Sequence, residues 1–412
     1  MDVVCPAYRQ IDGKPWVLPV VRMAEKQIAN DDALNHEYLS ILGMEDFTKA
    51  ASTLLLGRNS PAIVEKRVTK TQLDDILSPS FLVQCVVLTC MGAQVLGVQA
   101  LSGTGALRIG LEFLNKIANF KVIYISAPTW GNHILLFKHS GFTDHRTYRY
   151  WDYKSRKLDF EGMLQDLQAD PCAVQDAPED SVILMHACAH NPTGMDPTED
   201  QWKQIAQVMK ERKLMPFFDC AYQGFATGDL VKDSWAVRYF VEEGFEVICS
   251  QSFAKNFGLY NERIGNLTMV FRDTNTIPAA KSQLTLLVRG NYSNPPAHGA
   301  RIVHLVLTTP ELFSKWKEHI VEMSERIKEM RQGLRSRLEK LEAPGTWDHI
   351  TTQIGMFSYT GLSQEQVKHL VDHYHIYLPK DGRISLCGLN HKNLDYVADA
   401  FASTIRLLPN TG

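Results

Sequence analysis

The chain has 412 residues, of which 45% are hydrophobic and 22% are charged, and its formal net charge is −3. This length allows a large core and predicts two domains, and the near-neutral charge gives no electrostatic reason to expect nucleic acid as a partner. Eight cysteines without regular spacing predict reduced, buried thiols. Because residues 1–6 contain neither an apolar secretory core nor an arginine-rich leader, we expect a cytoplasmic protein.

A long uncharged stretch lies near the N-terminal end of the sequence. No charged residue occurs in 76–107, so a membrane-spanning segment at 79–101 is an alternative to a purely globular chain. Gln84, Gln94 and Gln99 interrupt this segment. We therefore favour a protein that does not span the membrane.

A glycine-rich turn at residues 102–106 follows this stretch and precedes a helical pattern at 107–114. Such a turn directs free backbone N–H groups and the helix dipole toward an anion. Ser102, Gly103 and Thr104 are therefore candidates for binding a phosphate, although most glycine-rich turns are only turns.

Short apolar or β-branched runs then alternate with segments of helical length. These runs are residues 122–125, 182–185, 216–218 and 245–249. The alternation predicts an α/β fold with a mostly parallel sheet and helices on both faces. The polar motifs follow these runs directly, so we expect them at the carboxyl ends of strands, where open α/β sheets bind ligands.

One long amphipathic helix is predicted over residues 312–341, where apolar residues recur at steps of three and four. A coiled coil is the alternative, but the apolar face is only one helix long and residues 344–345, Pro-Gly, end the pattern. We interpret this helix as the link between a large domain and a small C-terminal domain.

Lys255 lies in residues 250–258, with Ser252 three residues before it and Arg263 eight residues after it. This arrangement suits an imine-forming amine beside a site for a doubly charged phosphate. Asp219, Tyr222 and Asn191, which follow predicted strands, supply the carboxylate, phenol and amide that a pyridoxal phosphate ring requires.

A zinc site is an alternative for part of this region. His186, Cys188 and His190 alternate along the chain and would share one face of an extended strand. No fourth ligand follows nearby in the sequence, so we expect no metal.

At the motifs of Lys255, Asp219 and Asn191 the chain resembles the aspartate aminotransferases, especially the cytosolic animal type, among the fold-type-I pyridoxal phosphate enzymes. The resemblance continues through residues 7–9, 128–133, 261–263, 293–296 and 382–385. It implies a large domain of residues 15–322 that binds the cofactor, and a smaller α+β domain of residues 1–14 and 323–412 connected to it by the long helix.

The resemblance also implies the role of each candidate residue. Lys255 holds the cofactor covalently and carries the proton at the substrate Cα, which requires a depressed pKa. Asp219 keeps the ring nitrogen protonated, and Tyr222 and Asn191 hydrogen-bond the phenolic oxygen.

The implied phosphate contacts are residues 102–104, Ser252, Arg263 and, from a neighbouring subunit, Tyr38. The resemblance therefore implies a homodimer with shared active sites.

Around the ring, the resemblance implies that Trp130 stacks on the cofactor and that His133 bonds the ring-facing carboxylate. Arg383 binds the substrate α-carboxylate, with Trp130 and Asn191 beside it. Arg289 of the other subunit binds the distal carboxylate of a dicarboxylic amino acid.

Four features depart from the family pattern. Pro6 stands where the family has a glycine whose N–H meets the substrate carboxylate, and proline has no N–H to donate. The chain begins at this strand, so we expect a weaker dimer without the preceding arm. Residues 69–96 are an insertion, and Ala254 replaces a serine, a change from which we expect little effect.

The sequence therefore predicts an aspartate aminotransferase that converts L-aspartate and 2-oxoglutarate to oxaloacetate and L-glutamate by a ping-pong mechanism. A non-catalytic homologue that keeps the fold is one alternative. An aminotransferase that prefers aromatic or sulfinic substrates is another.

Overall fold

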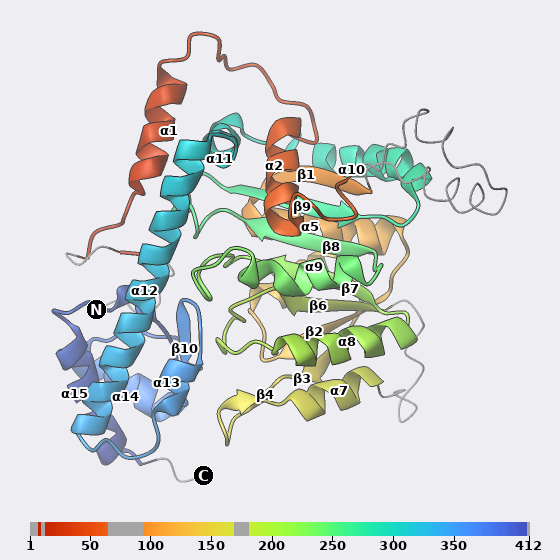
Figure 1. Ribbon diagram of the computed structural model, residues 1–412. Helices are drawn as coiled ribbons and strands as arrows, with labels where there is room; N and C mark the ends of the chain where they lie inside the picture. The colour runs from red at the N-terminus through yellow and green to blue at the C-terminus, as the bar shows by residue number, and fades with distance from the viewer. Residues whose placement is uncertain (1–6, 10–12, 65–93, 169–180, 410–412) are drawn as a thin grey trace, which may run out of the picture.

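The computed structural model describes residues 7–9, 13–64, 94–168 and 181–409. A seven-stranded sheet in the order β1-β9-β8-β7-β6-β2-β3 forms the centre of the larger lobe (Figure 1). The strands of this sheet are β1 (Val95–Leu101), β2 (Val122–Ala127), β3 (Asp144–Arg149), β6 (Val182–His186), β7 (Met215–Cys220), β8 (Val247–Ser252) and β9 (Ile264–Val270).

Strands β8, β7, β6, β2 and β3 run parallel, whereas β9 pairs antiparallel with both β8 and β1. The predicted mostly parallel sheet is therefore confirmed. A short hairpin of β4 (Trp151–Asp152) and β5 (Lys157–Leu158) lies outside the sheet.

Helices cover both faces of this sheet because neighbouring strand residues point to opposite sides. On β7, Phe217 packs with α5, α6 and α10, whereas Phe218 packs with α2, α7, α8 and α9. The helices of the larger lobe are α1 (Pro19–Ala29), α2 (Glu45–Leu56), α5 (Ser102–Glu112), α6 (Asn132–Ser140), α7 (Phe160–Gln168), α8 (Glu199–Glu211), α9 (Trp235–Glu242), α10 (Ile277–Tyr292) and α11 (Ala297–Thr308).

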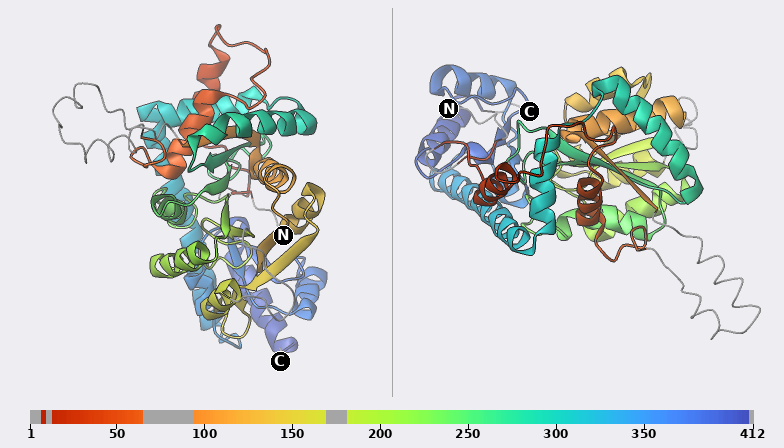
Figure 2. Two further views of the ribbon diagram at one scale, coloured as in Figure 1. Left: turned by 90° about the vertical axis from the view of Figure 1, so that its right-hand side faces the viewer. Right: turned by 90° about the horizontal axis from the view of Figure 1, so that it is seen from above.

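The long helix α12 (Pro310–Lys340) runs from the larger lobe into the smaller one, as Figure 2 shows. Its buried apolar residues, from Leu312 to Leu338, pack inside the core of the same chain, so the coiled-coil alternative is wrong. The smaller lobe contains α13 (Asp348–Thr352), β10 (Phe357–Tyr359), α14 (Gln364–Tyr374), β11 (Arg383–Ser385) and α15 (Leu394–Leu407).

Several sequence-based predictions fall on parts of the chain that are not described. Pro6 and most of the insertion at 69–96 lie outside the described residues. The last two residues of that insertion, Val95 and Leu96, begin β1 and pair with β9. Most of the uncharged segment at 79–101 also lies outside. Among the helices that are described, none has the length and apolar character needed to cross a bilayer.

Candidate active site

A cleft of about 240 Å³ opens at the carboxyl ends of the central strands. Strand pairing produces it: Asp219 on β7 lies opposite His186 of β6 and Ser250 of β8, so the segments that follow these strands meet at one edge. The predicted residues that line the cleft are Ser102, Gly103, Thr104, Trp130, Asn191, Asp219, Tyr222, Ser252, Lys255 and Arg263. Residues from separate parts of the sequence are thus brought together at the predicted place.

Asp219 is a buried carboxylate held by a histidine. Its Oδ2 is 3.2 Å from Nε2 of His133, and Nδ1 of His133 is 2.8 Å from the hydroxyl of Thr129. Burial raises the pKa of Asp219, but the hydrogen bond to His133 and the charges of His133 and Lys255 outweigh it, so the pKa lies below its usual range. The cleft therefore holds a carboxylate that stays ionised near neutral pH.

Lys255 follows β8, and its Nζ lies 5.1 Å from the centre of the Tyr222 ring. Burial lowers the pKa of Lys255, and the positive charge of Arg263 lowers it further, against the opposing charge of Asp219. The predicted depression of this pKa is present, and its main cause is desolvation. The neutral amine form is therefore more populated for Lys255 than for an exposed lysine.

Helix α5 begins at the cleft and directs its first backbone N–H groups toward it. The hydroxyls of Ser102 and Ser252 lie 2.9 Å apart, and Ser250 donates a hydrogen bond of 2.8 Å to the carbonyl of Gly103. A Cβ at Gly103 would lie only 3.0 Å from the Cβ of Ser252, so a larger side chain would crowd the turn. Hydroxyls, free N–H groups and the guanidinium of Arg263 form a region suited to an anion.

Asn191 connects the two lobes at the edge of the cleft. Its Nδ2 donates to the hydroxyl of Tyr222 over 3.4 Å, and its Oδ1 accepts a hydrogen bond of 2.7 Å from Arg383 of β11. The guanidinium of Arg383 also lies 4.4 Å from the centre of the Phe357 ring. Because no carboxylate is among these contacts, the arrangement leaves Arg383 able to bind an anionic substrate group.

A partly buried carboxylate, that of Asp196, fixes the backbone before Asn191. Asp196 accepts hydrogen bonds from the backbone N–H groups of Ala189, at 2.6 Å, and His190, at 2.9 Å. Ala189 has a φ of 50°, which is uncommon for a residue with a Cβ. Burial raises the pKa of Asp196 to about 6. Asp196 therefore stabilises the strained turn that positions Asn191.

Trp130 and His133 lie on the side of the cleft formed by the start of α6. Their rings are perpendicular, with centroids 5.3 Å apart. Trp130 lines the cleft, whereas His133 is fully buried beneath Asp219. Both residues therefore contact the region that the sequence predicted.

Tyr38 and Arg289 lie away from this cleft. The Tyr38 side chain is 82% exposed, and Arg289 donates hydrogen bonds to the hydroxyl of Ser293 and to Oδ1 of Asn294. Asn294 in turn donates to the carbonyl of Leu39 over 2.8 Å. Asn294 thus connects Arg289 to the backbone of Leu39, the residue next to Tyr38.

Within the described ranges, the cluster of side chains that could bind a metal ion differs from the zinc site considered from the sequence. It consists of His133, His186 and Asp219, and includes neither Cys188 nor His190. His133 and Asp219 already bond one another. Burial lowers the pKa of His186 to about 3, so its imidazole stays neutral beside Asp219.

Sequence reasoning missed some residues of the cleft. Tyr260, Leu107 and Ala221 line it, and the hydroxyl of Tyr260 accepts a hydrogen bond from the backbone of Tyr8. The position of Tyr260 between Lys255 and Arg263 was the available signal. Leu107 and Ala221 carry no chemical signal in the sequence.

Comparison with known proteins shows the family. The model of the aminotransferases of class I and II matches residues 92–401, and the chain belongs to this family. It is 54% identical to the cytoplasmic aspartate aminotransferase of Caenorhabditis elegans, over 98% of this chain and 91% of that protein.

Solved structures agree with this assignment. The aspartate aminotransferase from the cytoplasm of Saccharomyces cerevisiae is 43% identical, with a TM-score of 0.87 over 98% of this chain and 91% of that one. An aromatic-amino-acid aminotransferase from Burkholderia pseudomallei, covalently bound to pyridoxal phosphate, is 37% identical, with a TM-score of 0.86 over 98% and 92%.

Proposed function

We propose that the chain is an aspartate aminotransferase that uses pyridoxal 5'-phosphate. L-aspartate gives up its amino group and leaves as oxaloacetate, and 2-oxoglutarate then takes the amino group and leaves as L-glutamate. The observation that carries the proposal is one cleft that holds Lys255, Asp219 and Tyr222, with Arg383 bonded at its edge through Asn191. The match to aspartate aminotransferases over nearly the whole chain supports the choice of substrate.

The chemistry of the cleft fits this cofactor. Its phosphate would bind at the N-terminus of α5, with Ser252 and Arg263. Asp219 would hold the ring nitrogen protonated, and Tyr222 and Asn191 would donate to the phenolic oxygen. When bound, the cofactor supplies an electron sink that makes the substrate Cα proton acidic.

Lys255 is the proposed base and acid at the substrate Cα. A neutral amine is needed to accept this proton, and the lowered pKa of Lys255 makes that form available. Trp130, whose ring borders the same cleft, would exclude water from one face of the bound cofactor.

Arg383 and Arg289 are the proposed specificity residues. Arg383 would bind the α-carboxylate, since it already donates to Asn191 at the cleft. Arg289 would bind the distal carboxylate in the site of a neighbouring subunit, and Tyr38 would reach that subunit's cofactor phosphate. Neither residue lines the cleft of its own chain, and Tyr38 is exposed, which supports a homodimer with shared sites.

We also propose the domain division and the location predicted from the sequence. Arg326 of α12 supports residues 1–14 as part of the smaller domain, because its guanidinium lies 4.8 Å from the Tyr8 ring and donates to the carbonyls of Arg9 and Leu389. The cytoplasmic location is supported by similarity to proteins named as cytoplasmic.

A single-turnover experiment tests the proposed function. The protein is purified with pyridoxal phosphate, and L-aspartate is added without any oxo acid. We expect the visible absorption of the cofactor to shift, with one oxaloacetate formed per chain. A protein that binds the cofactor but yields no oxaloacetate would support the non-catalytic alternative, and faster turnover of phenylalanine than of aspartate would support the aromatic one.

Two variants test the residues. Lys255→Ala should abolish turnover while the cofactor still binds without a covalent bond. Arg289→Ala should lower kcat/KM for aspartate by ten- to a hundredfold, because a charge-assisted hydrogen bond contributes about 1.5–3 kcal/mol. The matched control is Arg22→Ala, since Arg22 is exposed and pairs only locally with Glu25. Equal kcat/KM values for the two arginine variants would refute the dicarboxylate assignment.

A further inference from the structure

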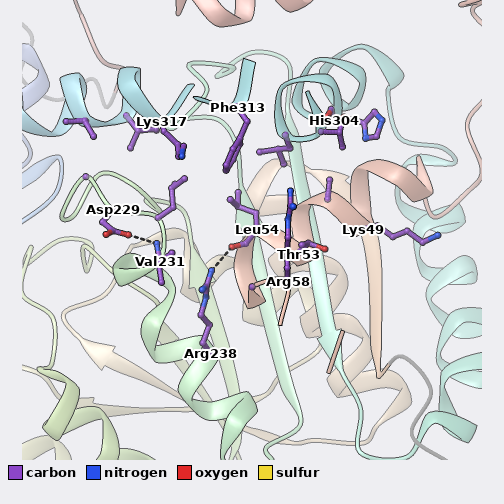
Figure 3. Close-up of a pocket in the computed structure, with 18 of the residues that line it drawn as sticks. Lys49, Thr53, Leu54, Arg58, Asp229, Val231, Arg238, His304, Phe313 and Lys317 are labelled. Carbon is purple, nitrogen blue, oxygen red and sulfur yellow. Dashed lines mark hydrogen bonds between the residues drawn. The ribbon is translucent and has the colours of Figure 1, made fainter. Parts of the chain in front are cut away.

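A second and larger hollow lies outside the cleft, between the larger lobe and the beginning of α12. Its volume is about 1020 Å³, compared with about 240 Å³ for the cleft, and the two share no lining residue. Figure 3 shows Phe313 and Lys317 of α12 on one side and Arg238 of α9 on the other, with Leu54 of α2 between them. We call this hollow the α12 groove.

The walls of the α12 groove are largely apolar. Leu54 and Ala50 of α2 face Phe313, Ile320 and Val321 of α12. Val321 is 47% exposed, although it lies on the same helix as a fully buried row of core residues. An apolar recess of this size is in the range of sites that bind small organic molecules.

The charged residues of the groove are mainly cationic. Asp229, one of two acidic residues that line it, accepts hydrogen bonds from the backbone N–H groups of Val231 and Lys232. Lys49 forms an ion pair with Glu45. The remaining cations are the guanidinium groups of Arg58 and Arg238 and the ammonium of Lys317.

None of these three cations forms an ion pair with a carboxylate among the described residues. Arg238 is half-buried and donates from Nε and Nη2 to the carbonyls of Leu55 and Leu54, at 2.9 and 3.0 Å. Burial lowers the pKa of Arg238, and the charges of Glu242 and Asp229 act in the opposite direction. Lys317 lies 5.2 Å from the centre of the Phe313 ring, and Arg58 makes neither a hydrogen bond nor an ion pair within the described ranges.

A further polar atom in the groove lacks a partner. Nδ1 of His304, on α11, is buried and makes no hydrogen bond to the described part of the chain. A buried polar group in a native structure usually has a partner. This atom offers a hydrogen-bonding position beside the apolar wall formed by Leu307 and Phe313.

We propose that the α12 groove is a second ligand site, for an amphipathic organic anion. Arg58 and Arg238 would bind the anionic head, a carboxylate, phosphate or sulfonate, because guanidinium groups match such oxygens. The apolar body would lie against Leu54, Phe313 and Ile320. The binding of two separate ligands is expected, since the groove and the cleft share no residue.

The probe for this site is 8-anilinonaphthalene-1-sulfonate, an aromatic sulfonate whose fluorescence rises in apolar surroundings. It is titrated into the holoenzyme at low salt. We expect saturable binding with one probe per chain, no displacement by saturating L-aspartate, displacement by decanoate, and none by decylammonium. Displacement by decylammonium as strongly as by decanoate, or the absence of saturable binding because another copy of the chain covers the groove, would overturn the proposal.

Variants locate the probe. The double variant Arg58→Gln with Lys317→Gln should weaken binding about two- to thirtyfold, because it removes two exposed charge contacts. Val321→Trp should fill the groove and abolish saturable binding while the thermal unfolding of the protein is retained. The matched control is Lys392→Gln, an exposed lysine of the smaller lobe that does not line the groove. Equal affinity in the double variant and the control would show that the probe binds elsewhere.

Discussion

Replacement of Asp196 by Asn tests whether the turn before Asn191 depends on the Asp196 carboxylate. Asp196 receives two backbone N–H groups, from Ala189 and His190. An asparagine has the same shape but only one oxygen, so one N–H group loses its acceptor. An unpaired buried donor costs about 1–3 kcal/mol, and a hydrogen bond to a charged group contributes about 1.5–3 kcal/mol, so we expect destabilisation of about 2–4 kcal/mol.

The assay is urea unfolding of the holoenzyme at pH 8, where Asp196, with a pKa raised by burial to about 6, is ionised. The control is Asp200→Asn on the following helix, because Asp200 is exposed and forms only a surface pair with Lys203. We also expect kcat/KM for aspartate to fall by about tenfold in Asp196→Asn, since Asn191 would lose its position beside Arg383.

Two results would contradict the role given to Asp196. If Asp196→Asn unfolds within about 0.5 kcal/mol of Asp200→Asn, the carboxylate does not hold the turn. If stability falls but kcat/KM for aspartate is unchanged, the turn does not position Asn191 for catalysis. Either result would refute part of the argument.

Three further predictions concern stability. Arg331→Met should cost about 2–4 kcal/mol in urea unfolding, because it removes the donors to the carbonyls of Ile350 and Gly355 inside the smaller lobe. Burial lowers the pKa of His349 to about 4. As pH falls from about 6.5 to about 4, the unfolded chain therefore binds a proton that the folded chain does not, and the unfolding free energy decreases. The His349→Gln variant should lose less unfolding free energy over this pH range. An unfolding free energy that depends on pH equally in the variant and the parent protein would contradict this prediction. Thr198→Ala removes the N-cap of α8 and should lower the unfolding free energy by about 1 kcal/mol, whereas no change by calorimetry would show that the cap is redundant.

The sequence contained a strong signal for the fold and for the chemistry of the cleft. Apolar runs followed by polar motifs identified β2, β6, β7 and β8, because a buried parallel strand must be apolar along its length. The period of the long helix predicted α12 from 312 to 341, close to its observed extent of Pro310–Lys340. Local patterns of this kind are written in neighbouring residues and need no knowledge of distant contacts.

Other features of the site depended on contacts across long distances in the chain. Nothing near Asp196 marks it as the acceptor for two N–H groups, and nothing near Leu107 or Ala221 marks them as walls of the cleft. The α12 groove joins α2, α9, α11 and α12, and its unpaired cations, such as Arg58, look like ordinary surface residues in the sequence.

The sequence by itself determined which residues were available for the chemistry: Lys255, Asp219 and Tyr222 could be selected by residue type and by their positions after apolar runs, and Arg383 by the family resemblance. Only the tertiary structure decided their electrostatic state and their neighbours. Burial and Arg263 lower the pKa of Lys255, and the contact between Asn191 and Arg383 spans 192 positions of the chain. The physical reason is that residue type is a local property, whereas desolvation and charge pairing depend on every segment that packs around a group.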